Sequence, residues 1–270
     1  MNQKKQSLLW RFWKPGDETR NSYLLGTMHV KSAVAFRRID LIKDLIKSCD
    51  AFAAELPIDE VNLHPEFARV FLATPANQLK SNLSTIRYEK LRSQILRAVN
   101  IDIEPIQHIR PMIISNMIDE AMMPPGFAQH ALDETLWRYA KELSKPTFGL
   151  EKVENQINVL QKVEPQQELR AFLGTVKNIS RHRTHIKKIL NWYETQQIQL
   201  LYKSSYKSLG AWRQLLLKNR NQIMVDELVL KTQTQSVFAA VGAAHLAGQY
   251  GVLRGLKKQG YKIAPWKKIN

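Results

Sequence analysis

Two short segments of the sequence share the pattern Gly-x-x-His, with Gly26 and His29 in the first and Gly242 and His245 in the second. A neutral imidazole can bind a transition-metal ion or transfer a proton. A glycine three residues earlier lets the backbone turn sharply and lets a ligand approach closely. Because such a tetrapeptide also occurs by chance, its meaning depends on the elements that hold the two histidines.

Four side chains that can bind metal or move protons each follow a short apolar run: His29, Glu55, Glu151 and His245. If the runs are parallel strands, these side chains meet at one edge of a sheet, where ligands of such sheets bind. Two imidazoles and one or two carboxylates suit Zn²⁺, Mn²⁺ or Co²⁺, with a coordination position left for water. A divalent metal there would lower the pKa of that water and polarise a carbonyl.

The apolar runs predict buried strands, because they lack the polar alternation of a half-exposed strand. They cover residues 22–25, 51–54, 146–150 and 237–241. Helical periodicity lies beside three of these four runs, at residues 35–48, 133–143 and 251–259. Alternating strands and helices predict an α/β fold with a mostly parallel central sheet and flanking helices.

The ends of these elements carry their own signals. Residues 8–14 and 21–25 flank Pro15-Gly16-Asp17 and are typical of a hairpin. Asp133 is a plausible N-cap for the helix that follows it, and we expect that role rather than a catalytic one. Gly260 suits the position just past a helix end, and residues 261–263 would form a last strand.

We expect a single domain over residues 1–270, with helical insertions at roughly 60–130 and 165–232, where helical patterns follow one another with little strand signal. The only cysteine, Cys49, cannot form an intramolecular disulfide, and its apolar neighbours indicate a buried side chain. The apolar stretch at Leu8-Leu9-Trp10 is too short for a signal peptide, and no window reaches the length of a transmembrane helix. These features favour a cytoplasmic protein. The oligomeric state is not indicated.

The net charge of +16 is carried almost wholly by the second part of the chain. From Leu169 onward there are eighteen Lys and Arg residues and three acids, whereas the residues before it are nearly balanced. This half could attract nucleic acid, an anionic membrane or an acidic partner. No known nucleic-acid motif accompanies the charge, which argues against nucleic-acid binding and favours an ordinary solvated helical surface.

Five segments, in order along nearly the whole chain, resemble the TraB/GumN family, which includes the Tiki metalloproteases and is related to the ChaN and erythromycin-esterase-like folds. They are Leu-Gly-Thr-x-His at residues 25–29, the glutamate-bearing strand end at 54–56, Lys-Pro-x-x-x-Leu-Glu at 145–151, Arg-Asn at 220–221 and Gly-Ala-Ala-His at 242–245. Ser144 and Asn219 depart from the pattern. Asn219 replaces a glutamate that could have oriented Arg220.

The resemblance implies a metal-dependent hydrolase of the peptidase kind, acting on a peptide or a small molecule. It makes His29 and His245 metal ligands and Glu55 a third ligand or a general base, with Glu151 in whichever role Glu55 does not fill. Arg220 would bind a substrate carboxylate or a developing oxyanion, or only form a salt bridge to the glutamates. The alternatives are a non-catalytic protein that binds haem or another ligand on this scaffold, and a basic protein that binds an anionic surface.

Overall fold

The computed structural model describes residues 6–126 and 128–266 of the chain. These residues divide into two compact units. The first unit comprises the described residues of 1–61, 126–153 and 191–270, and the second comprises 62–125 and 154–190. Three helices carry the chain between the units: α3 (Ile58–Leu63), α9 (Val153–Gln161) and α11 (Ile179–Glu194).

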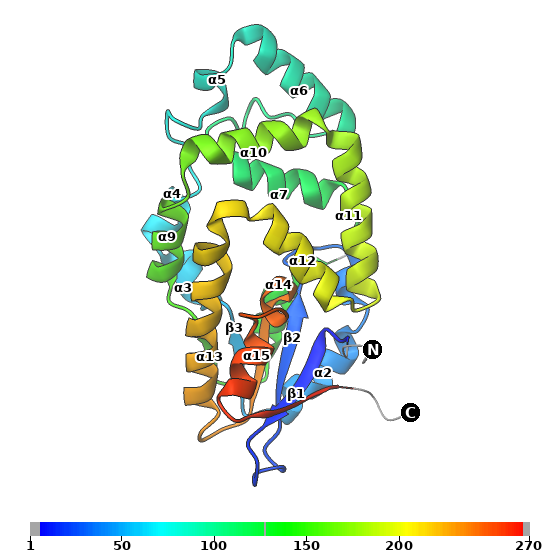
Figure 1. The fold of residues 1–270 in the computed structure, drawn as a ribbon, viewed down its shortest axis with the longest axis vertical. Helices are drawn as coiled ribbons and strands as arrows, with labels where there is room; N and C mark the ends of the chain where they lie inside the picture. Colours follow the sequence, from blue (N-terminus) through cyan, green and yellow to red (C-terminus); the bar gives the residue numbers. More distant parts are fainter. Residues whose placement is uncertain (1–5, 127, 267–270) are drawn as a thin grey trace. The chain divides into compact units, whose positions relative to one another are not determined.

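The first unit is built on a six-stranded sheet with the order β4-β3-β5-β2-β1-β6. Its strands are β1 (Leu9–Trp13), β2 (Ser22–Thr27), β3 (Ala51–Ala54), β4 (Thr147–Gly149), β5 (Val237–Gly242) and β6 (Lys262–Pro265). Neighbouring strands are parallel from β4 to β2, whereas β1 is antiparallel to both β2 and β6 (Figure 1). The predicted α/β class and mostly parallel sheet are therefore confirmed, and the expected hairpin is the pair β1–β2.

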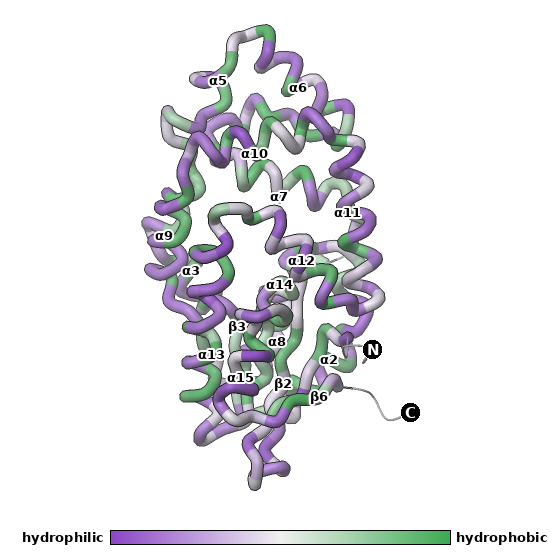
Figure 2. Tube along the Cα trace, viewed as in Figure 1, coloured by the Kyte–Doolittle hydropathy of each residue, from purple (hydrophilic) through white to green (hydrophobic). Residues whose placement is uncertain are grey.

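The central strands form the core because both of their faces are covered. Every residue of β2 and β3 is buried, as is every residue of β5 except the last. Phe52 of β3 stacks on Phe238 of β5 with ring centroids 6.1 Å apart, in the register that pairs these two residues across the strands. Figure 2 shows this apolar character as green along β2. Continuous burial thus explains why the strands lack polar alternation.

Seven α-helices with bounds inside the first unit surround this sheet. They are α1 (Ala33–Phe36), α2 (Ile39–Ser48), α8 (Leu132–Glu142), α12 (Ile198–Ser208), α13 (Arg220–Lys231), α14 (Ala243–Leu246) and α15 (Val252–Lys258), with a 3-10 turn at Gly210–Trp212 and a π-helix at Gln214–Asn219 before α13. Gly260 follows α15 with φ of 86°, the left-handed conformation that glycine adopts without steric cost, as predicted. Cys49 is buried, and burial raises the pKa of its thiol to about 12.

The predicted N-cap at Asp133 is wrong. Helix α8 begins one residue earlier, at Leu132, and its N-cap is Ala131, which makes no side-chain cap hydrogen bond. Asp133 instead lies in the first turn, where its Oδ1 accepts a hydrogen bond from the Thr27 hydroxyl at 2.5 Å. The carboxylate is therefore engaged by the end of strand β2, a contact that local helix signals do not reveal.

The second unit is helical throughout its regular elements. Its own helices are α4 (Pro65–Arg69), α5 (Leu79–Asn82), α6 (Thr85–Val99), α7 (Pro111–Ala121) and α10 (Pro165–Lys177). Three of them begin with proline, which has a suitable φ and no N–H to leave unpaired at the first helical position. Within residues 6–126 and 128–266, none of the helices combines the length and apolar composition needed to cross a bilayer.

A buried ion pair fastens the helices of the second unit. The Arg110 guanidinium donates to Glu168 Oε2 at 2.5 Å, and Glu168 also accepts from the Asn77 amide and the Met112 backbone N–H. Arg110 further donates to the Leu160 carbonyl at 2.9 Å. Both charged side chains are almost fully buried, so each depends on the other for its solvation.

We expect Glu168→Ala to lower the free energy of unfolding by about 3–5 kcal/mol, because it leaves the Arg110 charge buried and unpaired. Glu66→Ala is the matched control, since it breaks an exposed pair with Arg69 and should cost about 1 kcal/mol or less. Urea unfolding followed by circular dichroism measures both. Equal losses in the two variants would contradict the structural role of the buried pair.

Candidate functional site

Four of the predicted site residues meet at the carboxyl ends of the parallel strands. Glu55 follows β3, Glu151 follows β4, His245 lies in the short helix α14 after β5, and Arg220 is the first residue of α13. Arg220 Nη2 lies 2.8 Å from Glu55 Oε2 and 2.7 Å from Glu151 Oε1, and Arg220 Nε donates to Glu151 at 2.9 Å. The Glu151 side chain has no exposed surface. Within the described residues, its side-chain hydrogen bonds are all with Arg220.

The protonation states of this cluster follow from burial and from its charges. Burial alone would raise the pKa of Glu55, but the positive charges of protonated His245 and of Arg220, with the Gly242 N–H, lower it to about 2. Burial raises the pKa of Glu151 above its usual value, despite the neighbouring guanidinium. Burial lowers the pKa of His245 to about 4. At neutral pH the site therefore contains an ionised Glu55 and a neutral His245.

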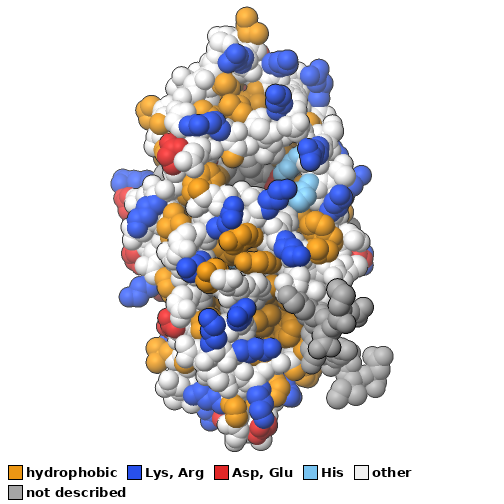
Figure 3. Space-filling view, viewed as in Figure 1, with side chains coloured by type: hydrophobic (Ala, Val, Ile, Leu, Met, Phe, Trp, Pro, Cys, Tyr) orange, Lys and Arg blue, Asp and Glu red, His pale blue; other side chains and the backbone are white. Residues whose placement is uncertain are grey.

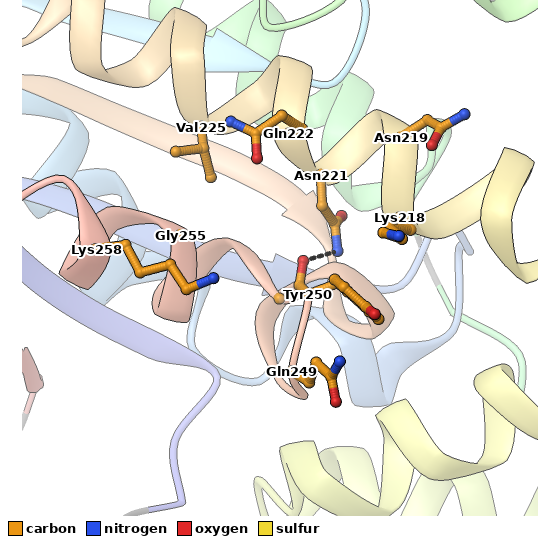
Figure 4. Close-up of a pocket in the computed structure, with 10 residues that line it drawn as sticks. Lys218, Asn219, Asn221, Gln222, Val225, Gln249, Tyr250, Gly255 and Lys258 are labelled. Atoms are coloured by element: carbon orange, nitrogen blue, oxygen red, sulfur yellow. Dashed lines mark hydrogen bonds between the residues drawn. The ribbon is translucent and has the colours of Figure 1, made fainter.

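Asn221 fixes which nitrogen of His245 carries the hydrogen. The Asn221 Nδ2 amide donates to the Tyr250 backbone carbonyl at 2.8 Å, which orients the amide (Figure 4). Its oxygen then faces His245 Nδ1 at 2.5 Å, so Nδ1 must be the donor. The lone pair of the neutral imidazole is consequently on Nε2, which lies 3.7 Å from Glu55 Oε1.

The juxtaposition of His245 Nε2 and Glu55 Oε1 has a chemical consequence. Both atoms present lone pairs, so they repel each other unless a proton donor or a cation lies between them. A water molecule or a metal ion could bridge such a pair. The amide of Asn221 matches the outer hydrogen bond that metal-binding histidines usually make through their second nitrogen. Sequence reasoning did not assign this role to Asn221, although the residue stands in the quoted Arg-Asn pair.

The glycines of the two Gly-x-x-His segments permit close approach between parts of the protein. Gly242 N–H donates to Glu55 Oε1 at 2.5 Å, and a Cβ at Gly242 would lie 3.0 Å from that oxygen. A Cβ at Gly26 would lie 2.6 Å from Leu246 Cδ1, and thus against the second segment. Neither glycine has a positive φ. The close approach expected for a ligand is made here by the Glu55 carboxylate and by the neighbouring motif.

His29 occupies different surroundings from His245. Its side chain is 78% exposed, and its Nδ1 lies 3.4 Å from Asp133 Oδ2. Asp133 in turn accepts a hydrogen bond from the Thr27 hydroxyl, so this carboxylate contacts both the last residue of strand β2 and His29, which follows it. Over the described part of the chain, no three His, Cys, Asp or Glu side chains are grouped so that they could hold a metal ion. The three-ligand set of His29, His245 and Glu55 stays a prediction.

Arg220 is oriented without the glutamate whose position Asn219 occupies. Asn219 is exposed, and its side-chain oxygen accepts a hydrogen bond from Gln214 at 2.7 Å. The two carboxylates that hold Arg220 are Glu55 and Glu151, which follow strands β3 and β4. Of the predicted roles for Arg220, the structure contains the salt bridge to both glutamates; binding of a substrate carboxylate or an oxyanion stays a prediction.

Comparison with protein families now places the chain. The model of the TraB/PrgY/gumN family matches residues 8–265, nearly the whole sequence. The chain belongs to this family. The TraB/PrgY/gumN match spans both Gly-x-x-His segments and every residue of the Arg220 cluster, which confirms the resemblance seen in the sequence. Comparisons with curated proteins and with solved structures gave no significant match.

The depressed pKa of His245 predicts acid sensitivity of folding. The unfolded chain takes up a proton on this histidine near pH 6.5, whereas the folded chain resists protonation until about pH 4. Its contribution to stability is therefore complete above pH 6.5 and is lost as the pH falls toward 4. Between pH 7 and pH 5 the loss should be about 2 kcal/mol.

The comparison of wild type with His245→Gln isolates this contribution, because the other titrating groups are common to both proteins. Urea unfolding of metal-free protein at pH 7 and pH 5 gives four free energies of unfolding. Wild type should lose about 2 kcal/mol more than the variant between the two pH values. Equal losses would show that His245 titrates normally in the folded protein.

Proposed function

We propose that this TraB/PrgY/gumN protein is a divalent-metal-dependent hydrolase, peptidase-like in its reaction, with His245 and Glu55 as two of the metal ligands. The observation that carries the proposal is the orientation of His245 by Asn221. It leaves the imidazole lone pair on Nε2, the nitrogen that lies 3.7 Å from Glu55 Oε1. Manganese, cobalt and zinc all accept this combination of imidazole and carboxylate.

The donor atoms fit a divalent ion in their chemistry. Glu55 binds Arg220 through Oε2 and presents Oε1 toward His245, so the guanidinium and a metal would use different oxygens. A third protein ligand is required for a catalytic site of this kind. We assign it to His29, whose side chain is exposed after β2 and is not grouped with the other two in the structure.

A divalent ion at this pair would supply Lewis acidity and an acidified water. Glu55, with a pKa of about 2, is a poor general base at neutral pH and better suited to binding a cation. Glu151 is fully buried behind Arg220, so it does not touch the substrate and serves as a positioning residue. Arg220 in turn holds the Glu55 carboxylate in the orientation that faces His245.

The most direct test of this proposal is to measure metal binding by variants of Asn221 and His245. We expect wild type to bind about one Mn²⁺, Co²⁺ or Zn²⁺ per chain, and Asn221→Ala to bind about 10–100-fold more weakly, because outer hydrogen bonds orient metal ligands. His245→Ala should abolish the binding. Affinities are measured by competition with a chromophoric chelator, and hydrolysis of a peptide library is followed by mass spectrometry.

Matched controls are available in the chain. Asn219→Ala removes an exposed amide two residues from Asn221, and His130→Ala removes a histidine that pairs with Glu134. Both should bind metal as wild type does. The proposal fails if Asn221→Ala and His245→Ala, with wild-type circular dichroism, keep full metal affinity. Metal binding without any hydrolysis would leave the ligand assignment intact and remove the enzymatic part.

A further inference from the structure

A cavity of about 250 Å³ lies beside the site, between helices α13 and α15 of the first unit. The two helices lie side by side in Figure 1 and pack against each other. The cavity is lined by Lys218, Asn219, Asn221, Gln222, Val225, Gln249, Tyr250, Gly251, Gly255 and Lys258 (Figure 4). It could hold several water molecules, each taking roughly 30 Å³, or a small ligand group of similar size.

The lining of this cavity is positively charged. It contains two lysines, Lys218 and Lys258, and no Asp or Glu. Four of the other residues, Asn219, Asn221, Gln222 and Gln249, carry side-chain amides, which supply further N–H donors. Asp226 of α13, next in sequence to the lining residue Val225, is not part of the lining and accepts a hydrogen bond from Gln222 at 2.9 Å. A lysine pair without a lining carboxylate leaves positive charge that an anion would neutralise.

Two contacts shape the cavity walls. Lys218 Nζ lies 4.5 Å from the centroid of the Tyr250 ring, a cation–π contact between two residues of the lining. Gly255 allows α15 to approach α13 closely, because a Cβ there would lie 2.5 Å from Val225 Cγ2. Most charged residues on the face drawn in Figure 3 are likewise Lys and Arg. The cavity is therefore a recess with a basic lining on a face that is itself rich in Lys and Arg.

One side chain connects the cavity with the candidate site. Asn221 lines the cavity, donates to the Tyr250 carbonyl and places its oxygen on His245 Nδ1. Asn221 is buried, and the neighbouring residue Arg220 holds both glutamates. A group bound in the cavity would thus lie one side chain away from the imidazole.

We propose that this cavity is an anion subsite, which receives a carboxylate or phosphate group of the molecule that binds at the His245–Glu55 pair. Lys218 and Lys258 provide the charge, and the surrounding amides provide neutral donors. The statement that the anion belongs to the substrate rests on the proposed hydrolase function. The binding of the anion itself does not, because none of the cavity residues is a proposed metal ligand.

The helix α15 offers a matched control for Lys258. Lys257 is the preceding residue and is also exposed, but it lines a different cavity of about 600 Å³ together with Arg254 and Leu253. Lys258→Gln and Lys257→Gln therefore change the net charge by the same amount on the same helix. Only the first removes a cation from the proposed subsite.

The test is isothermal titration calorimetry on metal-free protein at low salt. The probes are inorganic phosphate, N-acetylglycine and N-acetylglycinamide, which lacks the carboxylate. We expect at least one anion to bind wild type and the amide not to bind. Lys218→Gln and Lys258→Gln should each weaken anion binding roughly tenfold, since a charge-assisted hydrogen bond contributes about that factor. Lys257→Gln should bind as wild type does.

The two anionic probes distinguish the sources of the charge. Stronger binding of phosphate assigns the subsite to phosphorylated ligands, and stronger binding of N-acetylglycine assigns it to carboxylates such as a peptide C-terminus. The proposal is overturned if neither anion binds, if Lys257→Gln weakens binding as much as Lys258→Gln, or if the amide binds as well as N-acetylglycine. Because the protein is metal-free, these outcomes are independent of metal binding and hydrolysis.

Discussion

The site depends on the buried contact between one guanidinium and two carboxylates. Arg220 is stable in the interior only because Glu55 and Glu151 surround it, and removing either acid would leave an uncompensated charge. Each acid follows a different parallel strand, and Glu55 also accepts the Gly242 N–H at the end of β5. This one ion cluster therefore connects the ends of β3, β4 and β5 to helix α13. The same helix carries Asn221, which contacts His245.

The sequence predicts the scaffold of this site well, because the scaffold has local causes. Apolar runs without alternation locate the four parallel strands, and the residue after each run locates Glu55 and Glu151. The partner of a side chain is not local. His29 and His245 share one motif, yet the first lies exposed beside Asp133 and the second lies buried against Asn221. Nothing in either tetrapeptide encodes that difference.

Asp133 and Arg220 both have partners that lie far away in the sequence. Local helix signals predict a capping role for Asp133, and the family pattern would orient Arg220 by a glutamate at position 219, whereas the contacts in the structure come from distant segments. Asp133 accepts a hydrogen bond from Thr27, and Arg220 is oriented by acids 165 and 69 residues away. Composition likewise reveals the excess of basic residues but not which of them come together. Lys218 and Lys258 line a common cavity because α13 packs on α15.

The close packing at Gly26 bears on how the two histidine motifs can change. A Cβ at position 26 would lie 2.6 Å from Leu246 Cδ1 and 3.1 Å from the Ala243 Cα, so the segment that carries His245 must shift to accommodate any side chain there. A Cβ at Gly242 would instead lie 3.0 Å from the Glu55 carboxylate and does not meet the first motif. The coupling between the motifs therefore runs in one direction, and the packing of the second motif restricts which residues the first can carry.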